Sequence, residues 1–224
     1  MKLPMIRNAA EMEQLINEVG FLPYFKSEIQ GFSLEDCTPL ELWFVDGVEG
    51  PWEWREKIVE KGDIAYGKLF NKKTGFVSKN WYTDLVNYRR DGYDFDAHYD
   101  DGLSSYLCKR IVDLIQKYDS LLAKEIKYYL GFTKDGRSGF ETALTTLQMQ
   151  TYITVKSFEY KVNKFGKSYG WGAARYALSE SIFGESFVRS RYDIKPQDSK
   201  ALLSEHILRI FPDSTEKQIL KILR

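Results

Sequence analysis

The sequence of 224 residues is long enough for one or two domains with a hydrophobic core, and its 43% apolar and 15% aromatic residues exclude a disordered chain. No stretch resembles a signal peptide or reaches the length of a membrane-spanning helix, so we expect neither secretion nor a membrane protein. The net charge is zero, but residues 1–100 carry 12 Lys and Arg against 18 Asp and Glu, whereas residues 101–224 carry 20 against 14. The second half therefore has the basic surface that a polyanion would bind, although the opposite charges could also hold the two halves together.

The two cysteines, Cys37 and Cys108, lie far apart in the sequence and have neither metal-binding nor redox-motif spacing. Isolated thiols of this kind are typical of reduced cysteines in the cytoplasm, where we therefore expect the protein. A catalytic thiol is the less favoured interpretation.

Residues 1–101 are predicted to form an N-terminal α+β domain in which helices precede a β-hairpin. The hairpin signal is a pair of strand-like segments, residues 64–70 and 76–82, which flank a turn-rich sequence. Asn8 is a suitable N-cap for the first helix, and Gly20 is suited to end it. The helices predicted in this half cover residues 8–20, 38–44, 52–61 and 83–90.

The acidic segment 91–102 is predicted to be a loop between two domains, because charge sign and hydrophobic pattern both change there. Its carboxylates and its imidazole could bind a divalent cation, but the glycine and the distal glutamate of a calcium-binding loop are missing. A solvated linker that caps the next helix is the favoured interpretation, and neither a metal nor another cofactor is expected. The side chains considered are Asp94, Asp96, His98, Asp100 and Asp101.

Residues 102–178 are predicted to form a winged helix-turn-helix domain. Two helices with apolar residues at helical spacing, the second opening near Asp119, precede a third helix that begins near Gly139. The periodicity then changes to that of a strand over residues 152–162, and residues 169–176 can return as its partner. Three helices followed by a two-stranded hairpin is the winged-helix order.

The complete prediction is an α+β fold with two tandem winged-helix units and C-terminal helices. Helices followed by a hairpin make residues 1–101 a possible degenerate copy of the winged helix. Residues 179–224 form the C-terminal part, which is predicted to pack back on the core as short helices near 183–188, 199–210 and 214–223.

The predicted hairpin, rather than the third helix, carries groups suited to nucleic acid. The outer positions of the third helix include Thr142, Thr145 and Met149, which do not suggest sequence-specific reading of bases. In the hairpin, cations alternate with aromatic residues, which suits phosphate contact and stacking; an ordinary hairpin with its lysines in water is the alternative. The residues predicted to bind double-stranded DNA are Lys156, Lys161, Lys164, Lys167, Arg175, Tyr169 and Trp171.

The triplet Gln148–Met149–Gln150, which follows the predicted third helix, resembles the glutamine–apolar–glutamine element of the AlkZ-type winged-helix DNA glycosylases. That resemblance implies that Gln148 and Gln150 are catalytic residues for hydrolysis of the N-glycosidic bond to alkylated purines. The parent enzymes are longer and use three tandem winged helices, whereas this chain has room for two at most. Further stretches resemble a bacterial group of shorter AlkZ-related proteins, namely residues 21–25, 50–54, 139–152, 158–160 and 169–172.

The chemistry of this reaction is compatible with glutamine. An N7-alkylated purine already bears positive charge and leaves without strong acid assistance, so an amide can orient a water and stabilise the oxocarbenium-like transition state. On an ideal helix, Gln148 and Gln150 would lie about 200° apart, whereas in a strand they would share a face. Their position at the predicted change from helix to strand leaves both arrangements open.

The sequence therefore predicts a cytoplasmic protein that binds double-stranded DNA, resembles the AlkZ-type glycosylases and, as a hypothesis, excises alkylated purines. A non-enzymatic winged-helix DNA-binding protein, acting as a regulator or in damage recognition, is the main alternative. A winged helix used only for protein contact is another, consistent with the zero net charge. The sequence shows no glycine-rich phosphate loop, and His98 and His206 lie too far apart in it to suggest another enzyme class.

Overall fold

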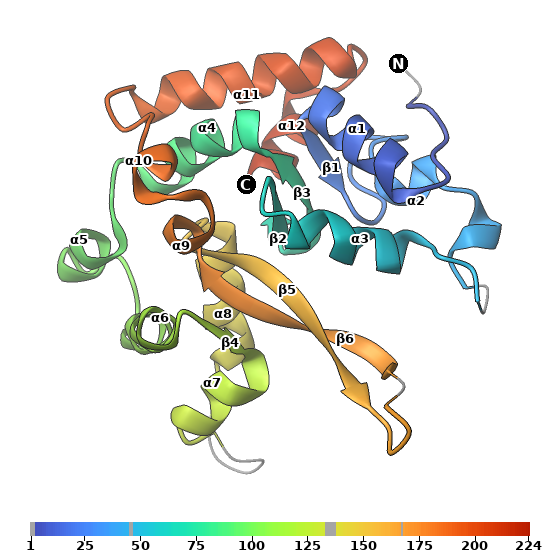
Figure 1. The fold of residues 1–224 in the computed structure, drawn as a ribbon. Helices are drawn as coiled ribbons and strands as arrows, with labels where there is room; N and C mark the ends of the chain where they lie inside the picture. Colours follow the sequence, from blue (N-terminus) through green and yellow to red (C-terminus); the bar gives the residue numbers. More distant parts are fainter. Residues whose placement is uncertain (1–2, 45–46, 133–137, 167) are drawn as a thin grey trace.

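The computed structural model of the chain describes residues 3–44, 47–132, 138–166 and 168–224. Within these residues the protein has a mixed α+β structure with two antiparallel sheets of three strands each. Figure 1 shows the two sheets in separate parts of the molecule, with a long hairpin extending from the second. The predicted α+β class is confirmed.

The N-terminal unit, residues 9–78, begins with α1 (Ala9–Val19). The Asn8 side chain caps this helix by accepting a hydrogen bond from the Glu11 N–H, and the helix ends where Gly20 adopts a φ of 77°. The fully buried strand β1 (Phe21–Pro23) follows and pairs with the last strand of the unit, so the sheet order is β1–β3–β2. The other elements are α2 (Leu34–Cys37), a 3-10 helix η1 (Leu40–Leu42), α3 (Pro51–Glu60), β2 (Ile64–Phe70) and β3 (Lys73–Ser78).

The second unit, residues 106–178, repeats this order of elements. In both units the first strand pairs with the third, because the sheet order of the second unit is β4–β6–β5. The apolar side chains of its helices meet its sheet in a separate hydrophobic core. Its elements are α6 (Tyr106–Tyr118), β4 (Ser120–Leu122), α7 (Ala123–Tyr129), α8 (Phe140–Met149), β5 (Ile153–Val162) and β6 (Ser168–Leu178).

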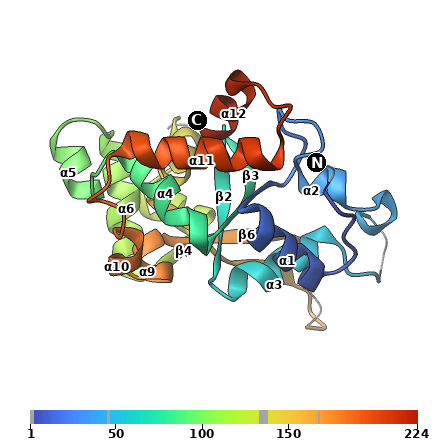
Figure 2. The same cartoon turned by 90° about the horizontal axis from the view of Figure 1, so that it is seen from above.

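The C-terminal helices pack on the N-terminal unit and share its hydrophobic core, as the sequence predicted. Figure 2 shows α11 lying across α4. Between these two helices the Ser199 hydroxyl donates to the buried Asp84 carboxylate at 2.9 Å and accepts from the Asn87 amide at 3.0 Å. The connecting and C-terminal elements are α4 (Lys79–Arg90), α5 (Phe95–Asp100), α9 (Ser179–Phe183), α10 (Glu185–Val188), α11 (Pro196–Ile210) and α12 (Glu216–Leu223).

Several boundaries differ from the sequence prediction, and the helix predicted over residues 38–44 is only the short 3-10 helix η1. The strand expected over residues 76–82 ends at Ser78, because Tyr82 lies on the buried face of α4, a helix that starts earlier than expected. The acidic segment expected as a loop contains α5, whose first turn is capped by the Asp94 side chain. The helix expected to begin near Asp119 begins at Ala123 instead, because residues 120–122 form a strand too short to show periodicity.

Candidate nucleic-acid interface

The β5–β6 hairpin changes character along its length. At its base Ile153, Thr154 and Val155 are buried, and the Thr154 hydroxyl donates to the Tyr66 carbonyl oxygen of β2 at 2.7 Å. Toward its far end the described side chains become exposed, over residues 161–166 and 169–171. Figure 1 shows this end projecting below α3. The hairpin is thus anchored between the two units, and its far end is free to contact a partner.

The cations predicted to bind DNA fall into two groups. Lys156 forms an ion pair with Asp119 at 2.5 Å, and Arg175 forms ion pairs with Glu159 and with Glu125 while also donating to a backbone carbonyl. These two cations are therefore neutralised within the protein. Lys161 and Lys164 are exposed near the far end, where the Lys164 ammonium lies 5.0 Å from the centre of the Phe165 ring. Lys167 lies outside the described residues.

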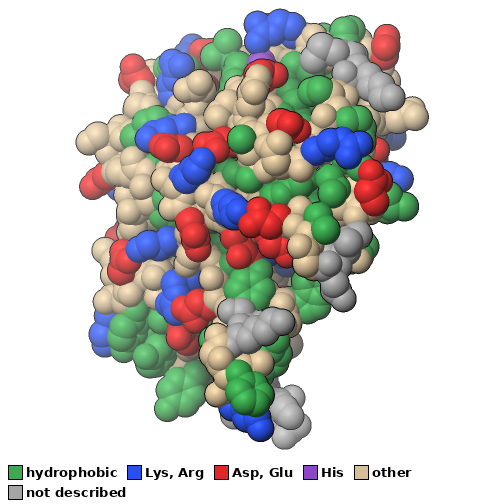
Figure 3. All heavy atoms as spheres, turned by 45° about the vertical axis from the view of Figure 1, so that its right-hand side comes forward, with side chains coloured by type: hydrophobic (Ala, Val, Ile, Leu, Met, Phe, Trp, Pro, Cys, Tyr) green, Lys and Arg blue, Asp and Glu red, His purple; other side chains and the backbone are tan. Residues whose placement is uncertain are grey.

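Large aromatic side chains accompany these two lysines. Phe165 is 81% exposed, Trp171 is 72% exposed and Tyr169 is also exposed. Figure 3 shows hydrophobic and basic side chains together at the lower end of the molecule, where the hairpin ends. The Trp171 ring packs edge-on against Trp52 of α3, with 5.2 Å between ring centres. Exposed rings beside exposed cations combine stacking surfaces with phosphate ligands.

Sequence reasoning did not single out Arg55 and Glu56 of α3, which lie beneath the hairpin. The Arg55 guanidinium lies 3.9 Å from the centre of the Phe158 ring, and the Tyr160 hydroxyl donates a hydrogen bond to Glu56. Loss of hydration raises the pKa of the Glu56 carboxyl to about 7, even though Arg55 nearby acts in the opposite direction. No local sequence motif predicts the contact between α3 and the β5–β6 hairpin.

Helix α8 of the second unit packs against β2 of the N-terminal unit. The Thr145 hydroxyl accepts from the Lys68 ammonium of β2 at 3.1 Å, and the Met149 carbonyl oxygen accepts from the Arg89 guanidinium at 2.8 Å. Thr142, near the start of the helix, is exposed. Of the three outer positions considered from the sequence, Thr145 therefore contacts β2, Met149 is partly buried and Thr142 is exposed.

The two glutamines have different environments. Gln148 is 2% exposed, and its side-chain oxygen accepts from the Lys68 backbone N–H at 3.0 Å while its amide group donates to the Leu144 carbonyl oxygen at 3.0 Å. Gln150 is the C-cap of α8, with near-helical backbone angles, so the helical arrangement holds. The Gln150 side-chain oxygen is buried and has no hydrogen-bond partner among the described residues.

Thr151, the next residue, adopts the left-handed conformation with a φ of 63°, which is rare for a β-branched side chain. Its carbonyl oxygen accepts hydrogen bonds from Arg90 at 2.7 Å, from Tyr82 at 3.3 Å and from Ser179 at 2.5 Å. The buried Arg90 also pairs with Glu180. Surrounding contacts thus hold a strained backbone in place directly after the glutamine triplet, which is a feature of functional segments.

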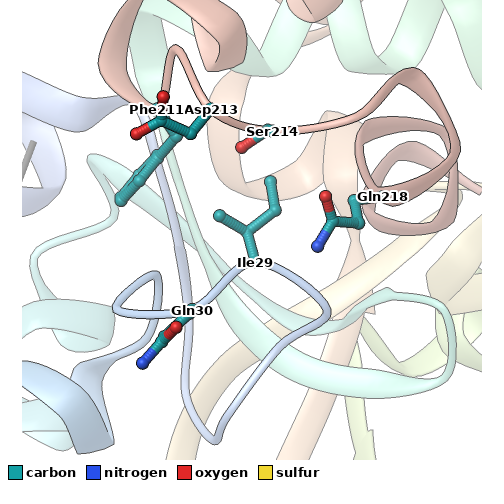
Figure 4. A pocket seen from close by; sticks show the side chains of 6 residues that line it. All are labelled: Ile29, Gln30, Phe211, Asp213, Ser214 and Gln218. Carbon is teal, nitrogen blue, oxygen red and sulfur yellow. The ribbon is translucent and has the colours of Figure 1, made fainter.

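A cavity of about 310 Å³ lies elsewhere, between the loop after β1 and the segment joining α11 to α12. Figure 4 shows Ile29, Ser214 and Gln218 lying around it. Gln218 bridges these segments by donating to the Glu28 carbonyl oxygen at 2.8 Å. Its lining combines two apolar side chains, Ile29 and Phe211, with four polar ones, of which Asp213 is the one carboxylate and Ser214 the one hydroxyl.

These features define a mixed α+β protein of two similarly ordered units with a hairpin that ends in exposed basic and aromatic side chains. A model of the AlkZ-related family matches residues 6–224, and the chain therefore belongs to that family. No curated protein and no solved structure gives a significant match. In the part of the chain that the structure describes, no helix has the length and apolar character needed to cross a membrane, and no group of His, Cys, Asp or Glu is arranged to hold a metal ion.

Proposed function

We propose that this AlkZ-related protein binds double-stranded DNA in the cytoplasm and that each of its units is a winged helix. The shared order of helices and strands, with the first strand paired to the third in both sheets, supports the winged-helix assignment. Family membership supports the DNA partner, since it relates the chain to DNA glycosylases.

The observation that carries the DNA proposal is the far end of the β5–β6 hairpin, where Lys161 and Lys164 are exposed beside Phe165, Tyr169 and Trp171. Lysines neutralise phosphates, and aromatic rings stack on sugars or unpaired bases. Because α8 is covered by β2, the mode in which a third helix enters the major groove is not favoured. The hairpin is therefore proposed to contact the DNA backbone or a distorted site.

The test is a titration of a short fluorescein-labelled duplex, followed by anisotropy at several salt concentrations. The double variant Lys161→Ala, Lys164→Ala should lower the slope of log affinity against log salt by about 2, since each phosphate contact contributes about 0.9. The matched control, Lys156→Ala with Lys217→Ala, removes the same charge but should leave the slope unchanged. Salt-independent or absent binding by the wild-type protein would contradict the proposal and favour a protein partner.

We further propose N-glycosidic bond hydrolysis in alkylated DNA, because the buried Gln150 side-chain oxygen, beside a strained Thr151, has no hydrogen-bond partner in the described part of the chain. An unpaired buried acceptor of this kind can orient a water or interact with positive charge that develops on the sugar. Both ends of the Gln148 amide are used within the protein, so in this proposal Gln148 positions the segment and Gln150 contacts the reacting atoms.

This second proposal is tested by measuring release of 7-methylguanine from alkylated duplex DNA. Gln150→Ala should reduce release to background while the protein stays folded at the assay temperature, whereas Met149→Leu, a neighbouring control, should keep the activity. Background release by the wild-type protein would reject the enzymatic proposal while leaving the DNA-binding proposal intact, and a non-enzymatic damage-recognition protein would then be favoured.

A further inference from the structure

Half of the large apolar side chains that are exposed among the described residues lie on one side of the molecule. Figure 1 shows the segments that carry most of them at the right and lower right, namely the chain between α2 and α3 and the far end of the β5–β6 hairpin. Single exposed apolar side chains are normal, whereas a contiguous group marks an interaction surface. The η1 surface consists of Phe25, Leu40, Phe44 and Val48, and the hairpin end of Val162, Phe165, Tyr169 and Trp171.

A series of aromatic contacts connects the η1 surface to the hairpin end. Phe25 stacks on Trp43, with 6.2 Å between the ring centres. Trp43 in turn packs edge-on against Trp52 at 5.9 Å, and Trp52 packs edge-on against Trp171 at 5.2 Å. Phe44, the residue after the buried Trp43, is 76% exposed. The two surfaces are therefore neighbours on one packed aromatic base.

The two surfaces carry opposite charges. Residues 34–44 and 47–54, which surround the η1 surface in the sequence, contain five Asp and Glu and no Lys or Arg. Two of these carboxylates have an exposed cation nearby, whereas in the described part of the chain Glu35, Asp36 and Glu53 form no ion pair. The hairpin end carries two exposed lysines. The η1 surface is thus acidic where the hairpin end is basic.

These opposite charges do not meet within one molecule. Contact of Trp171 with Trp52 holds the hairpin against α3, and the ion pairs of the described hairpin residues go to Asp119, Glu125 and Glu159, none of which belongs to the η1 surface. A second copy related by a two-fold axis can place each hairpin end on the η1 surface of the other. Because both surfaces lie on the same side of the molecule, one axis forms both contacts, as an isologous interface requires.

We propose that two copies of this chain form a symmetric dimer in which the hairpin end of each copy covers the η1 surface of the other. The aromatic side chains of the hairpin end bury Leu40 and Phe44, and its lysines face the carboxylates. The dimer thereby covers the lysines that the proposed function assigns to DNA, so a duplex and a second copy compete for the hairpin end. Only this competition rests on the proposed DNA-binding function.

Self-association is tested by sedimentation velocity over a range of protein concentrations. The wild-type protein should show a monomer–dimer equilibrium, and the double variant Leu40→Ser, Phe44→Ser should raise the dissociation constant of the dimer at least about tenfold. The matched control Leu103→Ser, Tyr128→Ser removes two exposed apolar side chains from the second unit and should leave the equilibrium unchanged. Wild-type protein that stays monomeric up to about 100 μM, or an equal effect of both variants, would overturn the proposal.

Charge reversal tests which surfaces meet. The variants Lys161→Glu, Lys164→Glu and Glu41→Lys, Glu49→Lys change exposed side chains, and each places like charges across both contacts of its own homodimer. Each should therefore weaken self-association at least about tenfold. A mixture of the two should form heterodimers, because every hairpin end then faces the opposite charge. Wild-type dimers that both reversals leave intact, or a mixture that stays monomeric, would refute this arrangement.

Competition with DNA is measured by adding a fluorescein-labelled duplex to the sedimentation experiment. The duplex should convert dimers into complexes of one protein chain with DNA, and the monomeric variant Leu40→Ser, Phe44→Ser should bind the duplex at least as tightly as the wild type. A dimer that binds the duplex without dissociating would contradict the place of the hairpin end in the interface. Dimers that form but do not bind a duplex would reject the proposed DNA binding and support the dimer, so the two failures are distinguishable.

Discussion

The side-chain oxygen of Gln148 accepts a hydrogen bond from the backbone N–H of Lys68 at 3.0 Å, and this bond joins α8 of the second unit to β2 of the N-terminal unit. The same amide group donates to the Leu144 carbonyl oxygen one turn earlier in α8. Gln148 is thus a link between the two units, placed at the residue that the family resemblance marks as catalytic.

Replacement of Gln148 by alanine should therefore lower the free energy of unfolding by about 1–3 kcal/mol, because the Lys68 N–H loses its acceptor. Gln150→Ala is the matched control and should cost less than about 1 kcal/mol, since no described residue donates a hydrogen bond to its side-chain oxygen. Urea unfolding followed by circular dichroism measures both. Equal losses in the two variants would show that Gln148 does not link the units.

A methyl group at Gly67 should disturb the same link. An added Cβ would lie 3.2 Å from the side-chain oxygen of Gln148, whose amide group is held in place by two hydrogen bonds, one to its oxygen and one from its nitrogen. Gly67→Ala should cost about 1–3 kcal/mol in the wild-type background and less in the Gln148→Ala background. A double-mutant cycle of unfolding free energies measures this coupling, and strictly additive effects would refute the contact.

Arg90 should be among the most sensitive positions of the protein. Its guanidinium is buried and holds Glu180, the Thr151 hydroxyl and the Thr151 carbonyl oxygen. Arg90→Met should reduce the free energy of unfolding by about 3–5 kcal/mol, as expected when one partner of a buried ion pair is removed. Lys156→Ala breaks an exposed ion pair and should cost no more than about 1 kcal/mol. Thermal and urea unfolding of both variants would reveal whether the two losses differ in this way.

Glu56 should make the stability of the protein depend on pH. Burial raises the pKa of its carboxyl to about 7 in the folded protein from an ordinary value of 4.5, so between these values the folded chain binds more protons than the unfolded chain. The contribution of Glu56 to the free energy of unfolding should fall as pH rises through this range, and it should stay low above pH 7.

The measurement is urea unfolding of wild type and Glu56→Gln between about pH 5 and about pH 8. The variant cannot ionise, so its advantage over the wild type should grow with pH across this interval. Glu60→Gln, an exposed carboxylate on the same helix, should follow the wild-type profile. A constant difference between Glu56→Gln and wild type would contradict the raised pKa.

Elements with a long apolar periodicity could be predicted from the sequence because their signal is local. The third helix was expected to begin near Gly139, and α8 starts at Phe140; the hairpin after it also lies where the change of period placed it. Strand β4 could not be predicted because three residues are too few to show a hydrophobic periodicity. The start of α4 could not be predicted because its aromatic residues also have a high propensity for strands.

The candidate site was predictable in its residue types but not in its arrangement. Composition and spacing pointed to the hairpin cations, yet Asp119 and Glu125, which pair with Lys156 and Arg175, come near only when α6, β4 and α7 pack against the hairpin. The hydrogen bond between Tyr160 and Glu56 joins positions far apart in the chain, so no local sequence pattern predicts it.

The sequence by itself determined the α+β composition, the positions of most helices and of both hairpins, and the glutamine triplet through which the chain resembles its family. Those properties depend on the spacing of residues that are close in the sequence, and this spacing does not depend on tertiary contacts. Only the tertiary structure decided that Gln148 faces Lys68, that the Gln150 side-chain oxygen is buried without a partner among the described residues, and that Tyr152 lines a cavity. The reason is physical: hydrogen bonding and burial of these side chains depend on elements that the chain brings together from distant positions.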